Sequence, residues 1–282
     1  YLIKQTKHHG GGDNICSMHN VSVNMGHFGN NAATSKTVGE YVGTKHRLQP
    51  YMKFPKGFIE AQDCQFTRRW VTSAMPGWNV DWTVNAVDTV SSGVGSGVKQ
   101  NSDVQCNEWV DHPVLVMQRD TFANFFHDSE DFINTFLSLA VLKLNLADTQ
   151  IYLTDLYPEG PFWDIWHKVF GRGFEGGNRE DYEKTSKAAI GKPAMSSWDL
   201  KNQFGSKSSK SNSNSNHRVC YKSLNIGIYG PAAPICVISW DTPCFHTALV
   251  RAYSDFIIRG LNLQVFSHYA LKTPLKTIQI TY

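Results

Sequence analysis

"PVLVMQ", residues 113–118, opens the stretch that decides the fold of this chain, and "TQIYLTD", residues 149–155, closes it. Both are short and almost continuously apolar, which is typical of strands buried on both faces of a sheet. Asp120 or Thr121 can cap a helix between them that runs to about Leu144. Strand, long helix and strand in this order predict a right-handed βαβ unit in a parallel sheet.

A second helix is expected directly after this unit, in "GPFWDIWHKVFGRG", residues 160–173. Pro161 lies near its expected start, and Gly171 or Gly173 marks its expected end. The whole pattern predicts an α/β fold with a parallel sheet and flanking helices. Further strands are expected in "SLNIGIYG" (223–230) and "PICVISW" (234–240), and an amphipathic helix in "CFHTALVRAYSDFIIRGL" (244–261).

The chain divides by composition on either side of this core. Residues 1–104 are rich in Gly, Asn, Ser and Thr, and predict an irregular, β-rich segment packed on an α/β domain at 105–272. "GSKSSKSNSNSN", residues 205–216, is polar and of low complexity. Since it cannot bury apolar surface, we expect a disordered surface insertion there.

Overall composition excludes several classes of protein. The 282 residues are 41% hydrophobic and 12% aromatic, which is enough to bury a sizeable core. A net charge of +3 gives no broad footprint for nucleic acid. No run of about eighteen apolar residues occurs, so the sequence predicts no membrane span. Without an initiator Met or a signal-like start, the chain is expected to be an excerpt of a longer protein.

The cysteines point to an oxidising compartment rather than to a structural metal. No C-x-x-C pair is present, so a zinc finger is not expected. Up to three disulfides can form, in any of about fifteen pairings. Asn20-Val21-Ser22 is a sequon that makes Asn20 a candidate for N-glycosylation. Together these features favour the secretory pathway. The six cysteines are Cys16, Cys64, Cys106, Cys220, Cys236 and Cys244.

The helix between the two strands carries a polar stripe. On a helical wheel at about 100° per residue, its apolar residues fill one half, and its polar residues cluster on the other. His127 and Asp131 are four residues apart, so the carboxylate can accept a hydrogen bond from the imidazole and fix its tautomer. Asn124 lies one turn earlier. The clustered residues are Asp120, Asn124, His127, Asp131 and Thr135.

This stripe can be a solvated helix face or a working site. In parallel sheets ligands bind beyond the carboxyl ends of the strands, which here are Arg119-Asp120 and Asp155. The stripe begins beside those ends, which favours the site. Glu130 projects nearer the apolar side, where we expect it to find a partner or to line the crevice.

The same residues resemble glycosyltransferase family 61, the group of the plant N-glycan β-1,2-xylosyltransferase and the EGF-domain O-GlcNAc transferase. The pattern is Asn, any residue, an aromatic, His, and then Asp four residues after the His. Asn124, Phe126, His127 and Asp131 match it in register. The stretch 220–260 is similar to the later part of the family's N-terminal half.

The resemblance implies the N-terminal half of a GT-B enzyme, in which residues 105–272 form a Rossmann-like domain and 273–282 begin a missing second domain. Such an enzyme moves a sugar from a nucleotide sugar, here a UDP-sugar, to a glycan or glycoprotein hydroxyl with inversion. It implies a Golgi or endoplasmic-reticulum lumen location, and a parent chain that can carry a membrane anchor elsewhere. The excerpt alone is expected to be inactive. Donor sugar, acceptor, linkage and metal dependence stay open.

The resemblance also implies roles for individual residues. His127 would be the base, Asp131 would orient it, and Asn124, Arg119 and Asp155 would bind substrate, with Arg119 meeting the diphosphate. Each role has a structural alternative. His127 and Asp131 can instead be a pair that fixes the helix, and Arg119 can form an ion pair with a neighbouring carboxylate.

Metal binding and sugar stacking are not indicated by local spacing. Asp128 and Glu130 point about 200° apart on a helix, so they cannot chelate one ion together, and no metal ligands are assigned. Trp163 and Trp166 can stack on a sugar, but their apolar neighbours favour a core stripe.

Two rival functions remain open. The first is a non-catalytic carbohydrate- or nucleotide-binding Rossmann-like module. The second is a hydrolase that uses Asp155 and His127, although the chain lacks a Gly-x-Ser-x-Gly elbow.

Overall fold

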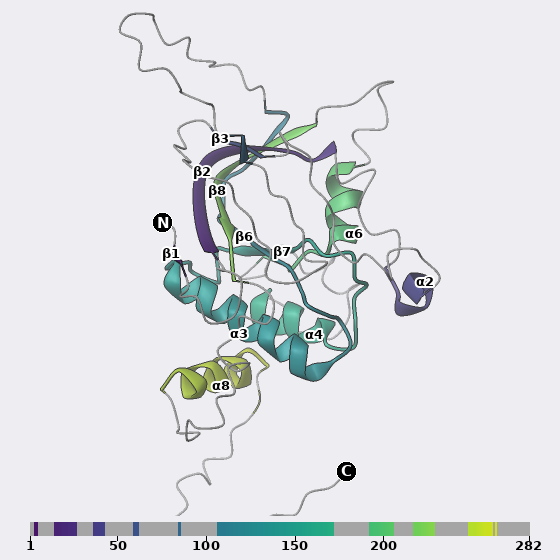
Figure 1. Ribbon diagram of the computed structural model, residues 1–282, viewed down its shortest axis with the longest axis vertical. Coiled ribbons are helices and arrows are strands. Elements are labelled where there is room, and N and C mark those ends of the chain that lie inside the picture. The colour runs from purple at the N-terminus through teal and green to yellow at the C-terminus, as the bar shows by residue number, and fades with distance from the viewer. Residues whose placement is uncertain are drawn as a thin grey trace, which may run out of the picture.

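A computed structural model describes residues 3–4, 14–26, 36–42, 59–61, 84–85, 106–171, 192–205, 217–228, 248–261 and 263. In these residues the fold centres on an eight-stranded mixed sheet of order β4-β3-β2-β8-β6-β7, with β1 beside β2 and β5 beside β8 (Figure 1). Its strands are β1 (Ile3–Lys4), β2 (Asn14–Asn24), β3 (Ile59–Ala61), β4 (Val84–Asn85), β5 (Glu108–Val110), β6 (Val114–Met117), β7 (Gln150–Leu153) and β8 (Arg218–Ile226).

Helices cover this sheet on both faces. Two short π-helical turns, η2 and η3, continue α4 and α6. The bounds of all the described helices are α2 (Val38–Val42), α3 (Phe125–Val141), α4 (Trp163–Ile165), η2 (Trp166–Phe170), α6 (Ser197–Leu200), η3 (Lys201–Gly205) and α8 (Ala248–Gly260). The predicted α/β, Rossmann-like class is confirmed. No helix among the described residues has the length and apolar character needed to cross a membrane.

The predicted βαβ unit is confirmed. β6 and β7 pair in parallel, from Val114 opposite Gln150 to Met117 opposite Leu153, and α3 is the connection between them. Every residue of both strands is buried. Strands buried on both faces need apolar side chains at consecutive positions, and this is why both segments lack polar alternation.

The N-cap of α3 was predicted at Asp120 or Thr121, and this was wrong. The helix starts later, with Asn124 as its cap, whose side chain accepts a hydrogen bond from the Phe126 backbone N–H. Asp120 is occupied elsewhere, because its side chain contacts His127 and its backbone N–H donates to Asp131. The helix also ends before Leu144, at Val141.

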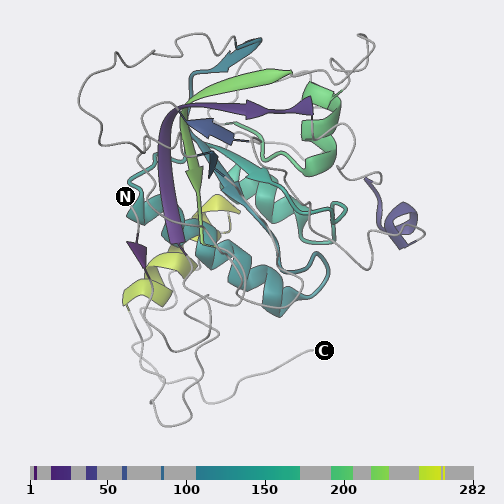
Figure 2. The same ribbon diagram turned by 45° about the horizontal axis from the view of Figure 1, so that its top comes forward.

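The N-terminal segment contributes to the same sheet. β2 runs antiparallel to β8, which itself runs parallel to β6 (Figure 2). The sheet is therefore mixed rather than wholly parallel, and it includes described strands from both sides of the expected boundary at 104/105. The expected insertion at 205–216 lies outside the described residues except for Gly205, which ends η3; residues 273–282 lie outside them entirely.

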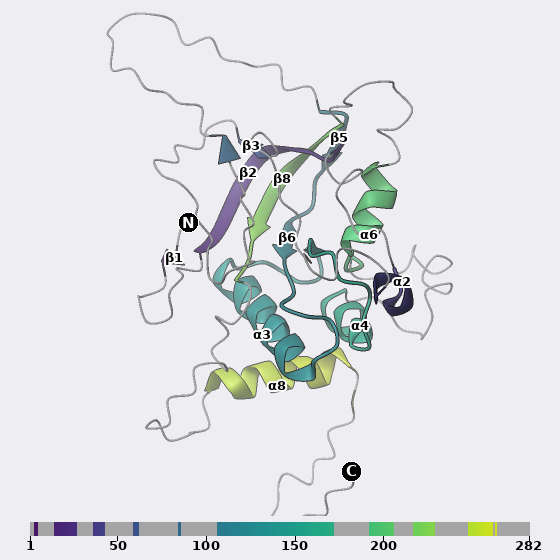
Figure 3. The same cartoon turned by 45° about the vertical axis from the view of Figure 1, so that its right-hand side comes forward.

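Two apolar clusters fill the two sides of the sheet. On the face of β6 and β7 that α3 covers, Phe132 of α3 packs against Trp166 and Phe170 of η2. α8 covers α3 and η2 from outside, with Phe256 against Phe136 (Figure 3). Trp163 and Trp166 are 7% and 1% exposed, so the core interpretation of this pair is confirmed. The other cluster joins Val116 and Tyr152 to residues of β2, β8, α6 and η3.

One disulfide is present among the described cysteines. It joins Cys106 to Cys220, and so ties the segment before β5 to β8 across 114 residues of sequence. The expectation that cysteines pair is confirmed for these two. The side chains of Cys16, Cys64, Cys236 and Cys244 lie outside the described part of the chain.

Candidate functional site

The residues that follow β6 and β7 meet as a sealed ion pair. Arg119 is 1% exposed and Asp155 0%. Nη2 of Arg119 lies 2.7 Å from Oδ1 of Asp155, and the Arg119 backbone N–H donates to Oδ2 of the same carboxylate. The other donors of the guanidinium reach the carbonyl oxygens of Tyr157 and Pro158. Burial alone lowers the pKa of Arg119, but the charge and hydrogen bonds of Asp155 outweigh burial and leave that pKa raised.

The ion-pair alternative for Arg119 is therefore confirmed. All three guanidinium nitrogens are engaged inside the protein. The expected substrate-binding roles of Arg119 and Asp155 stay untested predictions, and a diphosphate could meet Arg119 only if these contacts opened. In this structure the pair joins the two strand ends and fixes the loops that leave them.

A second set of contacts holds Asp120 in place from both sides. Its backbone N–H donates to Oδ2 of Asp131 at 2.9 Å, and its carbonyl oxygen accepts the hydroxyl of Tyr157 at 2.8 Å. Tyr157 is held in turn, since its backbone N–H donates to Asp155. The loop after β6 is thus bound to both α3 and the loop after β7.

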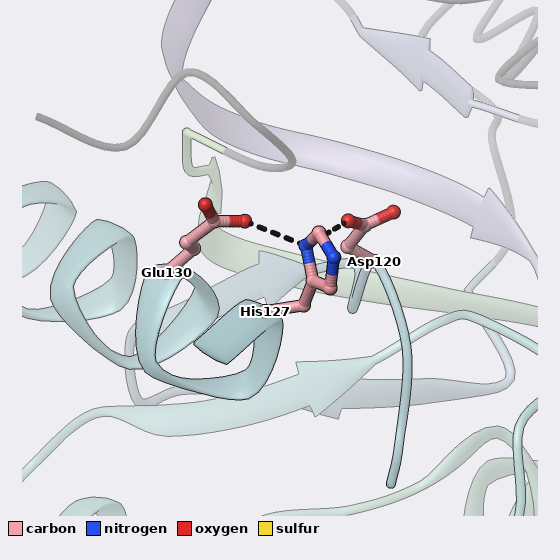
Figure 4. Close-up of side chains that lie close together, drawn as sticks. All are labelled: Asp120, His127 and Glu130. Carbon is pink, nitrogen blue, oxygen red and sulfur yellow. Dashed lines mark hydrogen bonds and ion pairs between the residues drawn. The ribbon is translucent and has the colours of Figure 1, made fainter. Parts of the chain in front are cut away.

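His127 lies at the centre of the site (Figure 4). Its Nδ1 is 2.9 Å from Oδ2 of Asp120 and 3.0 Å from Oε2 of Glu130. The imidazole is 39% exposed, whereas the side chains of Asp120 and Glu130 are 21% and 0% exposed. Among the described residues, no hydrogen bond engages Nε2 of His127. The ring is fixed on one side and accessible on the other.

The structure assigns the carboxylates differently from the helical wheel. In place of the bond to Asp131 that the spacing allowed, the His127 imidazole contacts Asp120 and Glu130. Asp131 is 1% exposed and holds the Asp120 backbone instead. Glu130 finds the partner expected for it. Sequence reasoning did not identify Asp120 as the partner of the His127 imidazole, because that contact depends on the path of the loop before α3.

Asp131 lies on the same side of α3 as Asn124 and His127, as its spacing predicted, but unlike them it is not accessible. Asn124 is exposed and His127 half-exposed, but Asp131 is buried because the chain at Asp120 folds back over it. Farther along the helix, Ser138 accepts the backbone N–H of Ile228, so the end of β8 also packs on this face. The buried polar residues of α3 are Asp128, Glu130, Asp131, Asn134, Thr135 and Ser138.

At the start of α3, by contrast, apolar side chains are exposed. Phe125 and Phe126 are 62% and 49% exposed, although the wheel placed them on the buried half. They are the first two residues of α3, and there the ring of Phe125 contacts that of Phe162, just before α4, at 5.4 Å between centroids. The ring of Phe126 contacts that of His127 edge-on, at 5.4 Å between centroids.

Burial changes the ionisation of the carboxyl groups around the site. It raises the pKa of Asp128 to about 7, although Arg119 lowers it. It also raises the pKa of Asp131 well above its ordinary value, with a further contribution from Asp120, and raises that of Asp120. One oxygen of Asp128 and one of Asp131 have no hydrogen-bond partner among the described residues. The region therefore holds more buried carboxyl groups than nearby cations.

The remaining candidate residues, Asn124 and Asn20, do not contact His127 through any hydrogen bond among the described residues. Asn124 caps α3 through its side chain, and its expected role in binding substrate is untested. Asn20 is exposed on β2 at a backbone φ of 52°, while Ser22 of its sequon is 4% exposed. Glycosylation at Asn20 stays a prediction.

Comparison with known proteins gives one informative similarity. No family model matches the chain. Over 188 residues it is 27% identical to the EGF domain-specific O-linked N-acetylglucosamine transferase of Drosophila melanogaster. The matched part is 63% of this chain and 28% of that protein, so the chain spans less than a third of the relative's length. This similarity supports a relationship to glycosyltransferase family 61, as the pattern at Asn124–Asp131 indicated, and leaves the subgroup open.

Proposed function

We propose that this chain is the N-terminal, acceptor-side part of a glycosyltransferase that moves a sugar from a nucleotide sugar to a hydroxyl of a glycan or glycoprotein, with inversion. The observation that carries the proposal is a half-exposed histidine, held by two carboxylates at a strand's carboxyl end, in a chain similar to an O-GlcNAc transferase. A UDP-sugar donor and a location in the lumen of the endoplasmic reticulum or Golgi belong to the same proposal. They are supported by that similarity and by the disulfide.

The chemistry assigned to His127 follows from its contacts. An inverting transfer needs one base to take the proton of the acceptor hydroxyl as its oxygen attacks the anomeric carbon. With Nδ1–H donating to Asp120 and Glu130, the lone pair lies on Nε2, for which the described residues provide no hydrogen-bond partner. The proton moves to Nε2, the new C–O bond forms, and the bond from the anomeric carbon to the diphosphate oxygen breaks.

The two carboxylates also stabilise the imidazolium that this step produces. Their negative charges lie about 3 Å from Nδ1, so they act more strongly on the charged ring than on the neutral one. Asp131 acts through Asp120, whose backbone it holds, rather than on the imidazole directly. In this scheme Asp120, Glu130 and Asp131 are positioning residues, and Asn124 contacts substrate from the exposed start of α3.

The test is sugar transfer by the full-length protein with a panel of UDP-sugars. His127→Ala should lower kcat by about 10²–10⁴-fold, because a general base is lost. His112→Ala is the matched control: that imidazole is also partly buried and bonded to one side chain, Gln150, but it precedes β6. The control should leave kcat unchanged.

Thermal unfolding of both variants separates catalysis from folding. The melting temperature of His127→Ala should stay close to that of the wild type. Normal turnover in His127→Ala would remove this residue from the mechanism. Bound UDP-sugar without any transfer in the wild-type protein would favour a non-catalytic binding module.

A further inference from the structure

We propose that Asp120, His127 and Glu130 form a binding site for a divalent transition-metal cation of the zinc type. The three side chains converge on one point from two elements, the loop after β6 and the first two turns of α3 (Figure 4). One ligand atom from each lies within 4.8 Å of the other two. Nothing in the local sequence spacing indicates this set, because Asp120 is separated from α3 by a loop.

The geometry is close to that of a three-ligand zinc site. With zinc–ligand bonds of about 2.0–2.1 Å, two ligands of a tetrahedral ion lie roughly 3.3 Å apart. Nδ1 of His127 is 2.9 Å from Asp120 and 3.0 Å from Glu130, so each contact must lengthen by only roughly 0.3–0.4 Å. The half-exposed imidazole leaves a route for entry, and the fourth position can be taken by water.

A buried carboxyl oxygen next to the cluster, without a hydrogen-bond partner in the part of the chain that the structure describes, is an independent argument. Asp131 is 1% exposed and lies against Asp120, because Oδ2 holds the Asp120 backbone N–H. Its other oxygen, Oδ1, has no hydrogen-bond partner among the described residues. The nearest guanidinium, that of Arg119, is already bonded through all three nitrogens. A cation bound at the cluster would interact favourably with this buried Oδ1 of Asp131, which is unpaired among the described residues.

The ligand types select the kind of cation. One imidazole nitrogen with two carboxylate oxygens suits Zn²⁺ and its transition-metal neighbours. Mg²⁺ prefers six oxygen ligands in octahedral geometry and retains several of its waters. A site in which one of three protein ligands is an imidazole nitrogen therefore suits it poorly. We therefore expect Zn²⁺ and Co²⁺ to bind in preference to Mg²⁺.

Cation binding would regulate the site, and this consequence rests on the proposed function. A metal on Nδ1 displaces the hydrogen shared with the carboxylates, and the neutral ring then carries its hydrogen on Nε2. That nitrogen can no longer accept the proton of the acceptor hydroxyl. Zn²⁺ would thus compete with the proton at Nδ1 and inhibit transfer reversibly.

Binding is tested on the whole chain with Co²⁺, whose visible absorption reports tetrahedral coordination, and by displacement with Zn²⁺. Since the chain has eleven histidines, variants decide the location. Glu130→Gln and Asp120→Asn should each weaken binding by at least about tenfold, as expected when a metal site loses a supporting group. His217→Ala should bind like the wild type. That imidazole also pairs with a carboxylate, Glu108, but lies before β8, at the opposite end of the sheet from Asp120.

The outcomes separate the two proposals. An absorption spectrum that is unchanged in both Glu130→Gln and Asp120→Asn would overturn the cation site, whatever the enzyme does. A spectrum lost in either folded variant supports it. If Zn²⁺ binds through Glu130 and transfer by the full-length protein is nonetheless unaffected, the cation site stands and the assignment of His127 as the base is wrong. Inhibition that EDTA reverses, and that is equally strong in His217→Ala, supports both.

Discussion

Two ionic clusters lie next to each other in the chain and differ in what their surroundings allow. The sealed pair, Arg119 with Asp155, is 2% and 0% exposed in its side chains, and every guanidinium nitrogen is bonded. The open cluster, Asp120 with His127 and Glu130, contains a ring that is 39% exposed and has one nitrogen without a partner among the described residues. Opposite charges at a strand's carboxyl end are therefore not enough to identify a site. Accessibility and unused bonding capacity separate the two.

The largest expected effect comes from breaking the sealed pair. Arg119→Met leaves Asp155 buried without its counter-charge, and should lower the free energy of unfolding by about 3–5 kcal/mol. Chemical denaturation with urea measures this. Lys168→Met is the matched control: it removes an ion pair with Asp164 in which the two side chains are 36% and 74% exposed, and it should cost no more than about 1 kcal/mol.

The double variant Arg119→Met with Asp155→Leu sharpens this result. Replacing both partners by apolar groups should recover much of the loss, because no unpaired charge stays buried. If Arg119→Met alone lowers the free energy of unfolding no more than Lys168→Met does, the sealed pair does not hold the two loops together as its contacts indicate.

A smaller effect is expected where β8 ends against the polar face of α3. A Cβ added at Gly227 would lie 2.3 Å from Sδ of Met117 and 2.7 Å from Oγ of Ser138. Gly227→Ala should therefore cost about 1–3 kcal/mol through overpacking. At Gly39 in α2 nothing lies within 4 Å of the added Cβ, so Gly39→Ala should be neutral or stabilise by up to about 1 kcal/mol.

This pair of variants tests whether α3 is held on its polar side as well as its apolar side. Calorimetry on both gives the melting temperatures. Equal melting temperatures in Gly227→Ala and Gly39→Ala would show that the end of β8 does not press on α3, and would weaken the explanation given for its buried polar residues.

The smallest expected effect is the pH dependence of stability that comes from Glu159, which lies near Arg119 of the sealed pair. Burial raises the pKa of Glu159 to about 7, with a contribution from Asp199, although Arg119 lowers it. A carboxyl group with a raised pKa binds more protons in the folded than in the unfolded protein between its two pKa values. Stability should therefore fall as pH rises from about 4.5 to about 7.

Glu159→Gln should flatten that part of the stability profile, because the amide cannot lose a proton. Urea unfolding of wild type and variant at several pH values between 4.5 and 7 provides the measurement. A profile with the same slope in both proteins would contradict the assignment of this pH dependence to Glu159.

Local pattern predicted the elements that form the site but not all of their contacts. The apolar runs at 113–118 and 149–155 predicted β6 and β7, and of the two ends expected for the second helix, Gly171 and Gly173, the structure has Gly171. The start of α3 was predicted too early. A side chain such as Asp120 can cap a helix in principle, and only the fold shows that Asp131 and His127 bind it instead.

The sequence by itself determined the βαβ unit, the position of Arg119 and Asp155 at the carboxyl ends of two strands, and the place of His127 beside those ends. These follow from short-range periodicity, and from the rule that parallel strands bring their carboxyl ends to one edge. Tertiary structure alone decided which polar residues of α3 are buried, because a helical wheel cannot show which elements cover each side. It also placed β2 in the sheet and brought Asp120 to His127, since both contacts depend on the path of the chain between elements.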